Sequence, residues 1–130
     1  MSVEIVDQMS ISVKGRIKNT YIFDSVFGPD STQEQIFEET KRLIQSAIDG
    51  YNVCIFAYGQ TGSGKTFTIQ GSPELPGLTP RSIEELFAII AKMTTFEVKL
   101  KCYMVEIYKG ELKDLLIPKN TKDRPKLEIK

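Results

Sequence analysis

Residues 59–66 read Gly-Gln-Thr-Gly-Ser-Gly-Lys-Thr and match the phosphate-binding pattern G-x-x-x-x-G-K-[ST] without interruption. They follow directly on an apolar run, residues 53–58. In the structure that this pattern builds, a buried strand leads into a loop, the backbone N–H groups of the loop converge on an anion, and a helix begins where the loop ends. The alternative is a Gly/Ser turn that joins a strand to a helix. We expect the ligand to be a nucleoside triphosphate.

Individual positions of this loop have chemical tasks. Gly59, Gly62 and Gly64 supply backbone torsions and a close approach that a Cβ would obstruct. The Lys65 ammonium can neutralise the β- and γ-phosphates. The Thr66 hydroxyl is suited to coordinate Mg²⁺, a hard ion that takes few protein oxygens and keeps several waters.

The composition is that of one soluble domain. The chain has 130 residues, of which 41% are hydrophobic and 26% charged, enough for a single modest core. Lys plus Arg equals Asp plus Glu at 17 each, so no net field favours nucleic acid or an anionic membrane as a partner. The apolar stretches are too short to span a membrane and the N-terminus does not resemble a signal sequence, so we expect an intracellular protein.

The chain has no His and two cysteines, Cys54 and Cys102. Without His or a C-x-x-C pair they make a poor zinc site, and we expect both to be buried free thiols in a reducing compartment. The absence of His also removes His-dependent nucleophilic triads and the usual general base. Phosphate chemistry fits this composition, because it needs positioning and charge more than a base.

Hydrophobic periodicity predicts strands and helices that place the loop. A helix begins at Ser31, since Glu34 three residues later completes a capping box, and it ends at Gly50. Residues 53–58 are apolar on both faces, as in a central parallel strand covered by helices. A small β region precedes these elements, with short strands at residues 3–6, 11–13 and 21–23.

The second half of the chain alternates in the same way. The breaker-rich stretch 71–77 predicts a protruding loop, and a helix follows over residues 80–93, with Thr79 as its N-cap and Pro80 in its first position. The remaining expected elements are a long strand over 96–108, a turn at 109–110, a short helix over 112–116 and a strand over 126–130.

A nucleotide hydrolase also needs an acidic residue near Mg²⁺ and a polar group that orients water. Asp24 follows an apolar run but more readily fixes a turn, and Glu106 and Asp114 are better explained as partners of backbone or surface groups. We therefore assign no catalytic residue.

Several stretches of the sequence closely resemble the nucleotide-binding core of kinesin motor domains. The longest is YNVCIFAYGQTGSGKTFT at residues 51–68. The others are FDSVF at 23–27, GLTPR at 77–81, EIY at 106–108 and DLL at 114–116. The resemblance covers roughly residues 20–130, and residues 45–52 look most like the calmodulin-regulated kinesins that carry their motor at the C-terminus.

The resemblance implies binding of ATP or ADP with Mg²⁺, and movement on microtubules in the cytoplasm by the full-length parent. Thr66 would hold the metal, and Phe67 falls where the family places an aromatic residue or His against adenine, with core packing as the alternative. The nucleotide-binding residues implied are Gly59, Gln60, Thr61, Gly62, Ser63, Gly64, Lys65, Thr66 and Phe67.

The implied fold is an α/β P-loop NTPase of kinesin type, with a mostly parallel central sheet, flanking helices and the small N-terminal β region. Residues 1–130 would be the N-terminal portion of the motor domain, with its insertion loop at about 70–78. The family's adenine-side Arg-x-Arg-Pro is not matched by residues 14–18, and both switch motifs are missing.

These departures make us expect little or no ATPase activity from the isolated chain, and an unfinished sheet whose apolar edge favours self-association. Two alternatives stay open. One is a motor-like module that binds a nucleotide or a partner without hydrolysis, and the other is an unrelated P-loop kinase.

Overall fold

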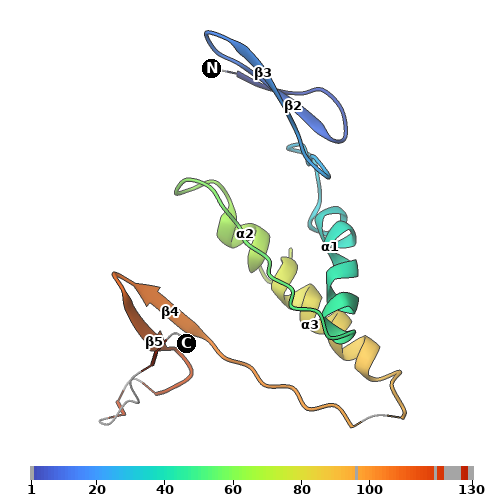
Figure 1. The fold of residues 1–130 in the computed structure, drawn as a ribbon, viewed down its shortest axis with the longest axis vertical. Coiled ribbons are helices and arrows are strands. Elements are labelled where there is room, and N and C mark those ends of the chain that lie inside the picture. The colour runs from blue at the N-terminus through green and yellow to red at the C-terminus, as the bar shows by residue number, and fades with distance from the viewer. Residues whose placement is uncertain (1, 96, 119, 122–126, 129–130) are drawn as a thin grey trace. The chain divides into compact units, whose positions relative to one another are not determined.

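The computed structural model describes residues 2–95, 97–118, 120–121 and 127–128. The chain divides into two compact units, Met1–Thr94 and Thr95–Lys130. The first unit holds a three-stranded antiparallel sheet and three helices, and the second holds a β-hairpin (Figure 1).

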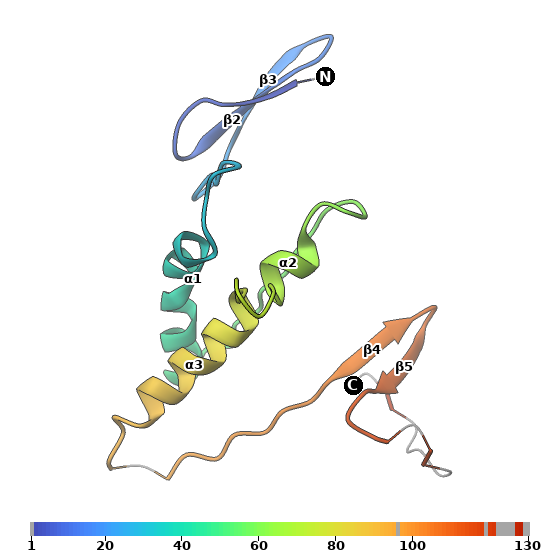
Figure 2. The same ribbon diagram turned by 180° about the vertical axis from the view of Figure 1, so that it is seen from behind.

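The expected N-terminal β region is confirmed. Strands β1 (Ser2–Ile5), β2 (Ser10–Lys14) and β3 (Lys18–Ile22) pair antiparallel in the order β1-β2-β3. Two hairpins connect them, as both views of the ribbon show (Figures 1 and 2). In the first hairpin the Asp7 carboxylate accepts hydrogen bonds from the Met9 N–H at 2.8 Å and the Ser10 hydroxyl at 2.7 Å. The bond from the Ser10 hydroxyl, and after it the bond from the Met9 N–H, lower the pKa of Asp7 below its ordinary value.

Helix α1 covers Gln33–Ile48. It begins one residue later than the predicted cap at Ser31 implies. The N-cap is Thr32 rather than Ser31: the Thr32 Oγ1 accepts from the Gln35 N–H at 3.2 Å, and the Gln35 Oε1 accepts from the Thr32 N–H at 2.9 Å. The capping-box pattern occurs twice in overlapping registers. The second, Thr32 with Gln35, forms both bonds, while the Glu34 carboxylate of the first pairs with Arg81. The predicted end of the helix near residue 50 is confirmed, with Asp49 as the C-cap.

The predicted central strand is wrong, and with it the mostly parallel sheet. Residues 51–59 have no regular secondary structure, and both sheets of the described chain are antiparallel. A strand needs neighbours that pair with its N–H and C=O groups. No described residue pairs in this way with 53–58, so Phe56 and Tyr58 are 86% and 101% exposed. An apolar run identified a segment suited to a sheet interior but carried no information about which strands would flank it.

Two helices follow the phosphate loop. Helix α2 covers Lys65–Ile69, and helix α3 covers Leu78–Ile90. The predicted N-cap Thr79 is wrong, since α3 begins two residues earlier with Gly77 as its N-cap. Pro80 lies within the first turn of α3, where the backbone N–H groups have no partner inside the helix, so the missing N–H of proline costs no hydrogen bond. A proline can therefore occupy any position of the first turn, and it locates the start of a helix only to within a turn.

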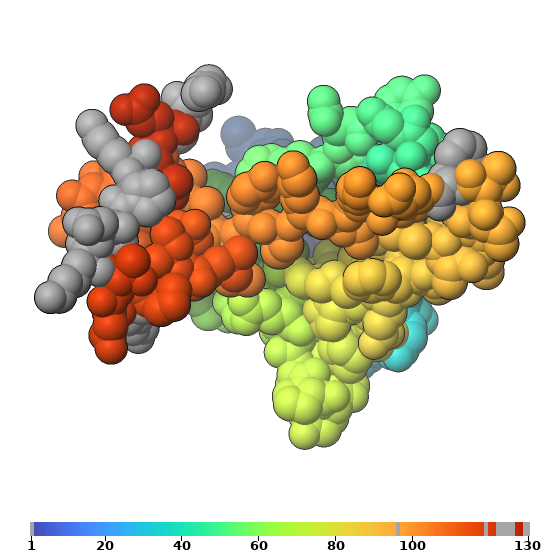
Figure 3. All heavy atoms as spheres, turned by 90° about the horizontal axis from the view of Figure 1, so that it is seen from below, coloured from blue at the N-terminus to red at the C-terminus, as the bar shows by residue number. Residues whose placement is uncertain are grey.

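A tight turn separates α2 from α3, as the stretch of breakers predicted. Ser72 and Leu75 exchange backbone hydrogen bonds of 2.9 and 3.2 Å. A Cβ on Gly71 would collide with the backbone of Leu75 and Gly77, so the turn closes only with glycine at this position. The turn is the yellow-green projection at the lower edge of the space-filling view in Figure 3.

The apolar core of the first unit lies between the helices. Phe37 and Ile44 of α1 and Leu78 of α3 are its buried members. An ion pair of 3.2 Å between Lys41 and Glu85 also joins α1 to α3. Partly buried side chains that pack around this core are Ile36, Ile48, Ile69, Leu86 and Ile89.

The second unit contains one hairpin, β4 (Val105–Tyr108) and β5 (Glu111–Asp114). Its turn is the predicted Lys109-Gly110, with φ of 50° and 83°, which suits a two-residue hairpin turn. The predicted long strand is confirmed only from residue 105. Residues 97–103 have no regular secondary structure, and Met104 contributes only its carbonyl, which accepts from the Leu115 N–H at 2.8 Å. The predicted short helix over 112–116 is wrong, since the turn pairs residues 111–114 with β4. The strand predicted over 126–130 falls mainly outside the described residues.

Cys54 and Cys102 are free, as predicted, but the prediction that they are buried is wrong. Both thiols are exposed because they lie in the two extended segments that have no strand beside them.

Candidate nucleotide-binding site

The phosphate loop of residues 59–64 closes on itself through its backbone. The Ser63 N–H donates to the Gln60 carbonyl at 3.1 Å. Gly62 and Gly64 have φ of 81° and 89°, a conformation that side chains with a Cβ rarely adopt. A Cβ on Gly59 would press against the Ser63 hydroxyl. The glycines of the pattern therefore lie where the bend of the chain requires them.

Lys65 is the first residue of α2, and its ammonium reaches back across the loop. It donates to the carbonyl of Gly59 at 2.9 Å and to that of Gln60 at 2.8 Å. An ammonium has three N–H donors, so one remains for an anion above the loop. The positive charge is thereby held at the loop by the backbone itself.

A surface hollow of about 370 Å³ adjoins this charge. Phe67 forms part of its wall and is 49% exposed, so its ring is available to a ligand as well as to the protein interior. Thr66 lies beside Lys65 with an exposed side chain. The hollow is lined by Thr61, Gly62, Gly64, Lys65, Thr66 and Phe67, six of the nine residues predicted to bind the nucleotide.

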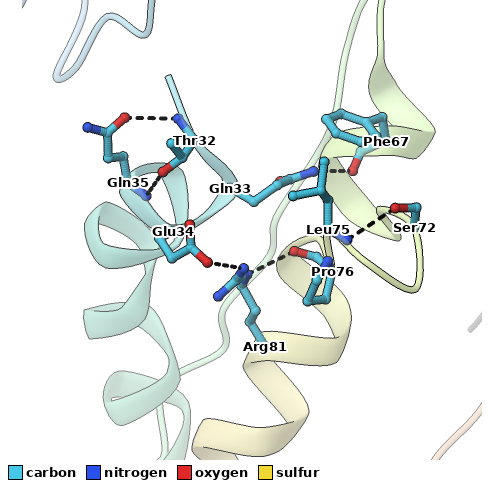
Figure 4. A network of polar contacts seen from close by, with 9 residues as sticks. All are labelled: Thr32, Gln33, Glu34, Gln35, Phe67, Ser72, Leu75, Pro76 and Arg81. Atoms are coloured by element: carbon cyan, nitrogen blue, oxygen red, sulfur yellow. Dashed lines mark hydrogen bonds and ion pairs between the residues drawn. The ribbon is translucent and has the colours of Figure 1, made fainter. Parts of the chain in front are cut away.

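A polar network fixes the helices around the loop (Figure 4). The Gln33 amide of α1 donates to the carbonyl of Phe67 in α2 at 2.8 Å. Arg81 of α3 donates to the Glu34 carboxylate at 2.7 Å and to the Pro76 carbonyl at 2.8 Å. The hydrogen bond from Arg81, together with its charge, lowers the pKa of Glu34 below its ordinary value of 4.5.

Gln33 was not predicted as a site residue from the sequence. Its only signal was its place next to the N-cap, which predicts a helix start and no contact with another helix. Arg81 belongs to the GLTPR stretch that carried the resemblance, but nothing in that stretch indicated its bonds to α1.

Two of the acidic candidates, Glu106 and Asp114, bond to nearby residues of the second unit. Glu106 pairs with Lys113 across the hairpin at 3.9 Å, and Asp114 accepts from the Leu116 N–H at 2.8 Å. Among the described residues, no cluster of three or more His, Cys, Asp or Glu side chains could hold a metal ion. The same residues include no helix with the length and apolar character needed to cross a membrane.

The family model of the kinesin motor domain matches residues 3–130, so the chain belongs to the kinesin motor domain family, a family of microtubule-binding motors. Within that family it is similar to KIN-14 kinesins. It is 60% identical over 111 residues to the kinesin-like protein KIN-14I of Oryza sativa subsp. japonica, and 58% identical over 114 residues to KIN-14E of Arabidopsis thaliana. These matches cover 85% and 87% of the chain, which spans only 9% of each relative.

Solved structures show the same family. The motor domain of the Kar3-like kinesin from Ashbya gossypii superposes with a TM-score of 0.73 at 34% identity, over 88% of this chain and 39% of that one. A structure described as "KIF14[391-755] - ADP in complex with a microtubule" gives a TM-score of 0.73 at 35% identity, over 96% of this chain and 38% of that one. The described fold therefore corresponds to part of a kinesin motor fold.

Proposed function

We propose that the chain is the nucleotide-binding, N-terminal portion of a kinesin-type microtubule motor and binds ATP or ADP with Mg²⁺ at residues 59–67. The observation that carries the proposal is the Lys65 ammonium, held over the loop by two carbonyls beside a hollow of phosphate-loop residues. The glycine torsions fit a phosphate cradle, and the Thr66 oxygen fits a hard cation. When bound, Mg²⁺ neutralises charge on the phosphates.

A nucleotide titration tests the proposal. We expect the chain to bind Mg-ATP saturably, and Lys65→Ala to weaken binding by about 10- to 100-fold, since a charge-assisted hydrogen bond contributes about 1.5–3 kcal/mol. Isothermal titration calorimetry measures both constants. Lys92→Ala removes an exposed lysine just after α3 and serves as the matched control, with unchanged affinity expected. Equal affinities for the chain and its Lys65→Ala variant would contradict the proposal.

The isolated chain is proposed to bind ATP without appreciable turnover. The support is that Glu106 pairs with Lys113 across the β4–β5 hairpin and Asp114 accepts from the Leu116 N–H just after it, and that no carboxylate of the described residues lines the hollow beside Lys65. A phosphate-release assay with and without microtubules measures the turnover. Microtubule-stimulated steady-state hydrolysis by the chain would overturn this part of the proposal.

The parent protein is proposed to move on microtubules in the cytoplasm. Family membership and the similarity to a kinesin structure described in complex with a microtubule support this proposal. Regulation by calmodulin rests on the resemblance of residues 45–52 alone, and binding of calmodulin by the parent in the presence of Ca²⁺ is its test.

A further inference from the structure

Gln33 is a polar side chain with an unusual position for the first residue of a helix. It is 6% exposed, and its amide nitrogen donates to the carbonyl of Phe67, 34 residues further along the chain, at 2.8 Å. A carbonyl can only accept, so the nitrogen of the amide must face it. Figure 4 shows this contact, which bridges α1 and α2.

The way helix α2 ends explains why the Phe67 carbonyl accepts a hydrogen bond from a side chain. Helix α2 ends at Ile69. The last carbonyls of a helix have no donor inside the helix, so they depend on N–H groups that follow it or on side chains. Both the Gln70 and Gly71 N–H groups donate to the Thr66 carbonyl, at 2.7 and 3.3 Å, rather than to that of Phe67. Gln33 thus takes the place of the backbone donor that a longer helix would supply.

A second bond from the same turn of α1 acts on the neighbouring segment. The carboxylate of Glu34 accepts from Arg81 at 2.7 Å, and Arg81 also donates to the Pro76 carbonyl at 2.8 Å. Two consecutive residues of α1 therefore hold the end of the phosphate-loop helix and the turn that follows it.

We propose that Gln33 is a positioning residue for nucleotide binding: through the Phe67 carbonyl it fixes the orientation of Phe67 and of the preceding Thr66 in the hollow. This inference rests on the proposed function of the loop. The Gln33 Oε1 is buried without a hydrogen-bond partner among the described residues, and an unpaired buried oxygen destabilises a fold. The side chain is thus poorly suited to stability alone and well suited to holding α2.

The isosteric variant Gln33→Met separates positioning from stability. It leaves the Phe67 carbonyl without a donor but also removes the unpaired oxygen, so the two effects on stability offset each other. We expect the melting temperature of the chain to stay within about 2 °C, while Mg-ADP binding measured by calorimetry weakens by about 3- to 10-fold, as for loss of one neutral hydrogen bond. Gln45→Met changes an exposed glutamine of the same helix. It removes only the exposed hydrogen bond to Asp49 at the far end of α1, so it should leave the affinity unchanged and alter the stability by less than about 0.5 kcal/mol.

A tryptophan reporter adds a spectroscopic test. The chain contains no Trp, so Phe67→Trp introduces a single indole at position 67, whose emission can be excited apart from that of the five tyrosines. Adding Gln33→Met should shift its emission maximum and increase its quenching by acrylamide, and adding Gln45→Met should not.

Failure of this inference differs from failure of the proposed function. If Lys65→Ala weakens nucleotide binding but Gln33→Met leaves both the affinity and the reporter spectrum unchanged, the positioning role is overturned and the site stands. If Gln33→Met lowers the melting temperature far enough for unfolding to account for the lost affinity, the positioning role is also overturned, because that result indicates a structural role. If the unsubstituted chain binds no nucleotide, the proposed function fails and this inference with it.

Discussion

Lys65 and Glu34 show how single side chains tie the phosphate loop to its surroundings. Lys65 bonds to the backbone of its own loop, so its charge stays in place without a carboxylate partner. Glu34 instead bonds outside its own helix, because its carboxylate accepts a hydrogen bond from Arg81 on α3. The loop residues and their torsions were predictable because the pattern prescribes them locally. The Gln33 and Arg81 contacts were not, because they depend on how three helices meet.

The Glu34–Arg81 pair predicts an acid-dependent part of stability. The pKa of Glu34 is lower in the folded chain than its ordinary 4.5, so the pair stabilises the fold above that value and its contribution is lost as the pH falls through the folded pKa. Glu34→Gln should therefore flatten the decline in urea stability between about pH 5 and pH 3, relative to the unsubstituted chain. The exposed Glu39→Gln variant should retain the original slope, and identical slopes for all three chains would contradict the prediction.

Helix starts show where sequence patterns mislead at the scale of elements. Ser31-x-x-Glu34 and Thr32-x-x-Gln35 both fit a capping box, and in the structure only the second is formed while Glu34 accepts from Arg81 on α3. Periodicity predicted α1, α3 and the N-terminal β region. It failed for residues 53–58 and 97–103, because strands form only where other strands pair with them.

The capping box gives a prediction with an internal control. Thr32→Ala should destabilise the chain by about 1 kcal/mol, since the Gln35 N–H loses its acceptor. Ser31→Ala, one residue earlier, should change stability by less than about 0.5 kcal/mol. Urea unfolding followed by circular dichroism measures both. A larger effect at residue 31 than at residue 32 would restore the N-cap that the sequence first indicated.

At the scale of the whole molecule, many large apolar side chains of the described residues are exposed. Phe56 and Tyr58 are 86% and 101% exposed, and Ile22 is 79% exposed. Phe37, Ile44 and Leu78 are the buried apolar residues of the described chain. Large exposed apolar areas favour association, so we predict that the isolated chain forms dimers or larger species at micromolar concentration.

Sedimentation velocity at several concentrations measures this association. Phe56→Ser, at an 86% exposed position of the unpaired segment, should lower it, whereas Glu74→Ser at an exposed polar position should leave it unchanged. A 14.7 kDa monomer at all concentrations would contradict the prediction.

We propose above all that this kinesin segment binds a nucleoside triphosphate at Lys65 without turning it over. The most direct measurement is one sample of the chain titrated with a fluorescent ATP analogue in Mg²⁺, then followed for phosphate release after microtubules are added. We expect saturable binding that unlabelled ATP displaces and Lys65→Ala weakens, with no microtubule-stimulated release. Absence of binding, binding that is insensitive to Lys65→Ala, or stimulated release would each contradict it.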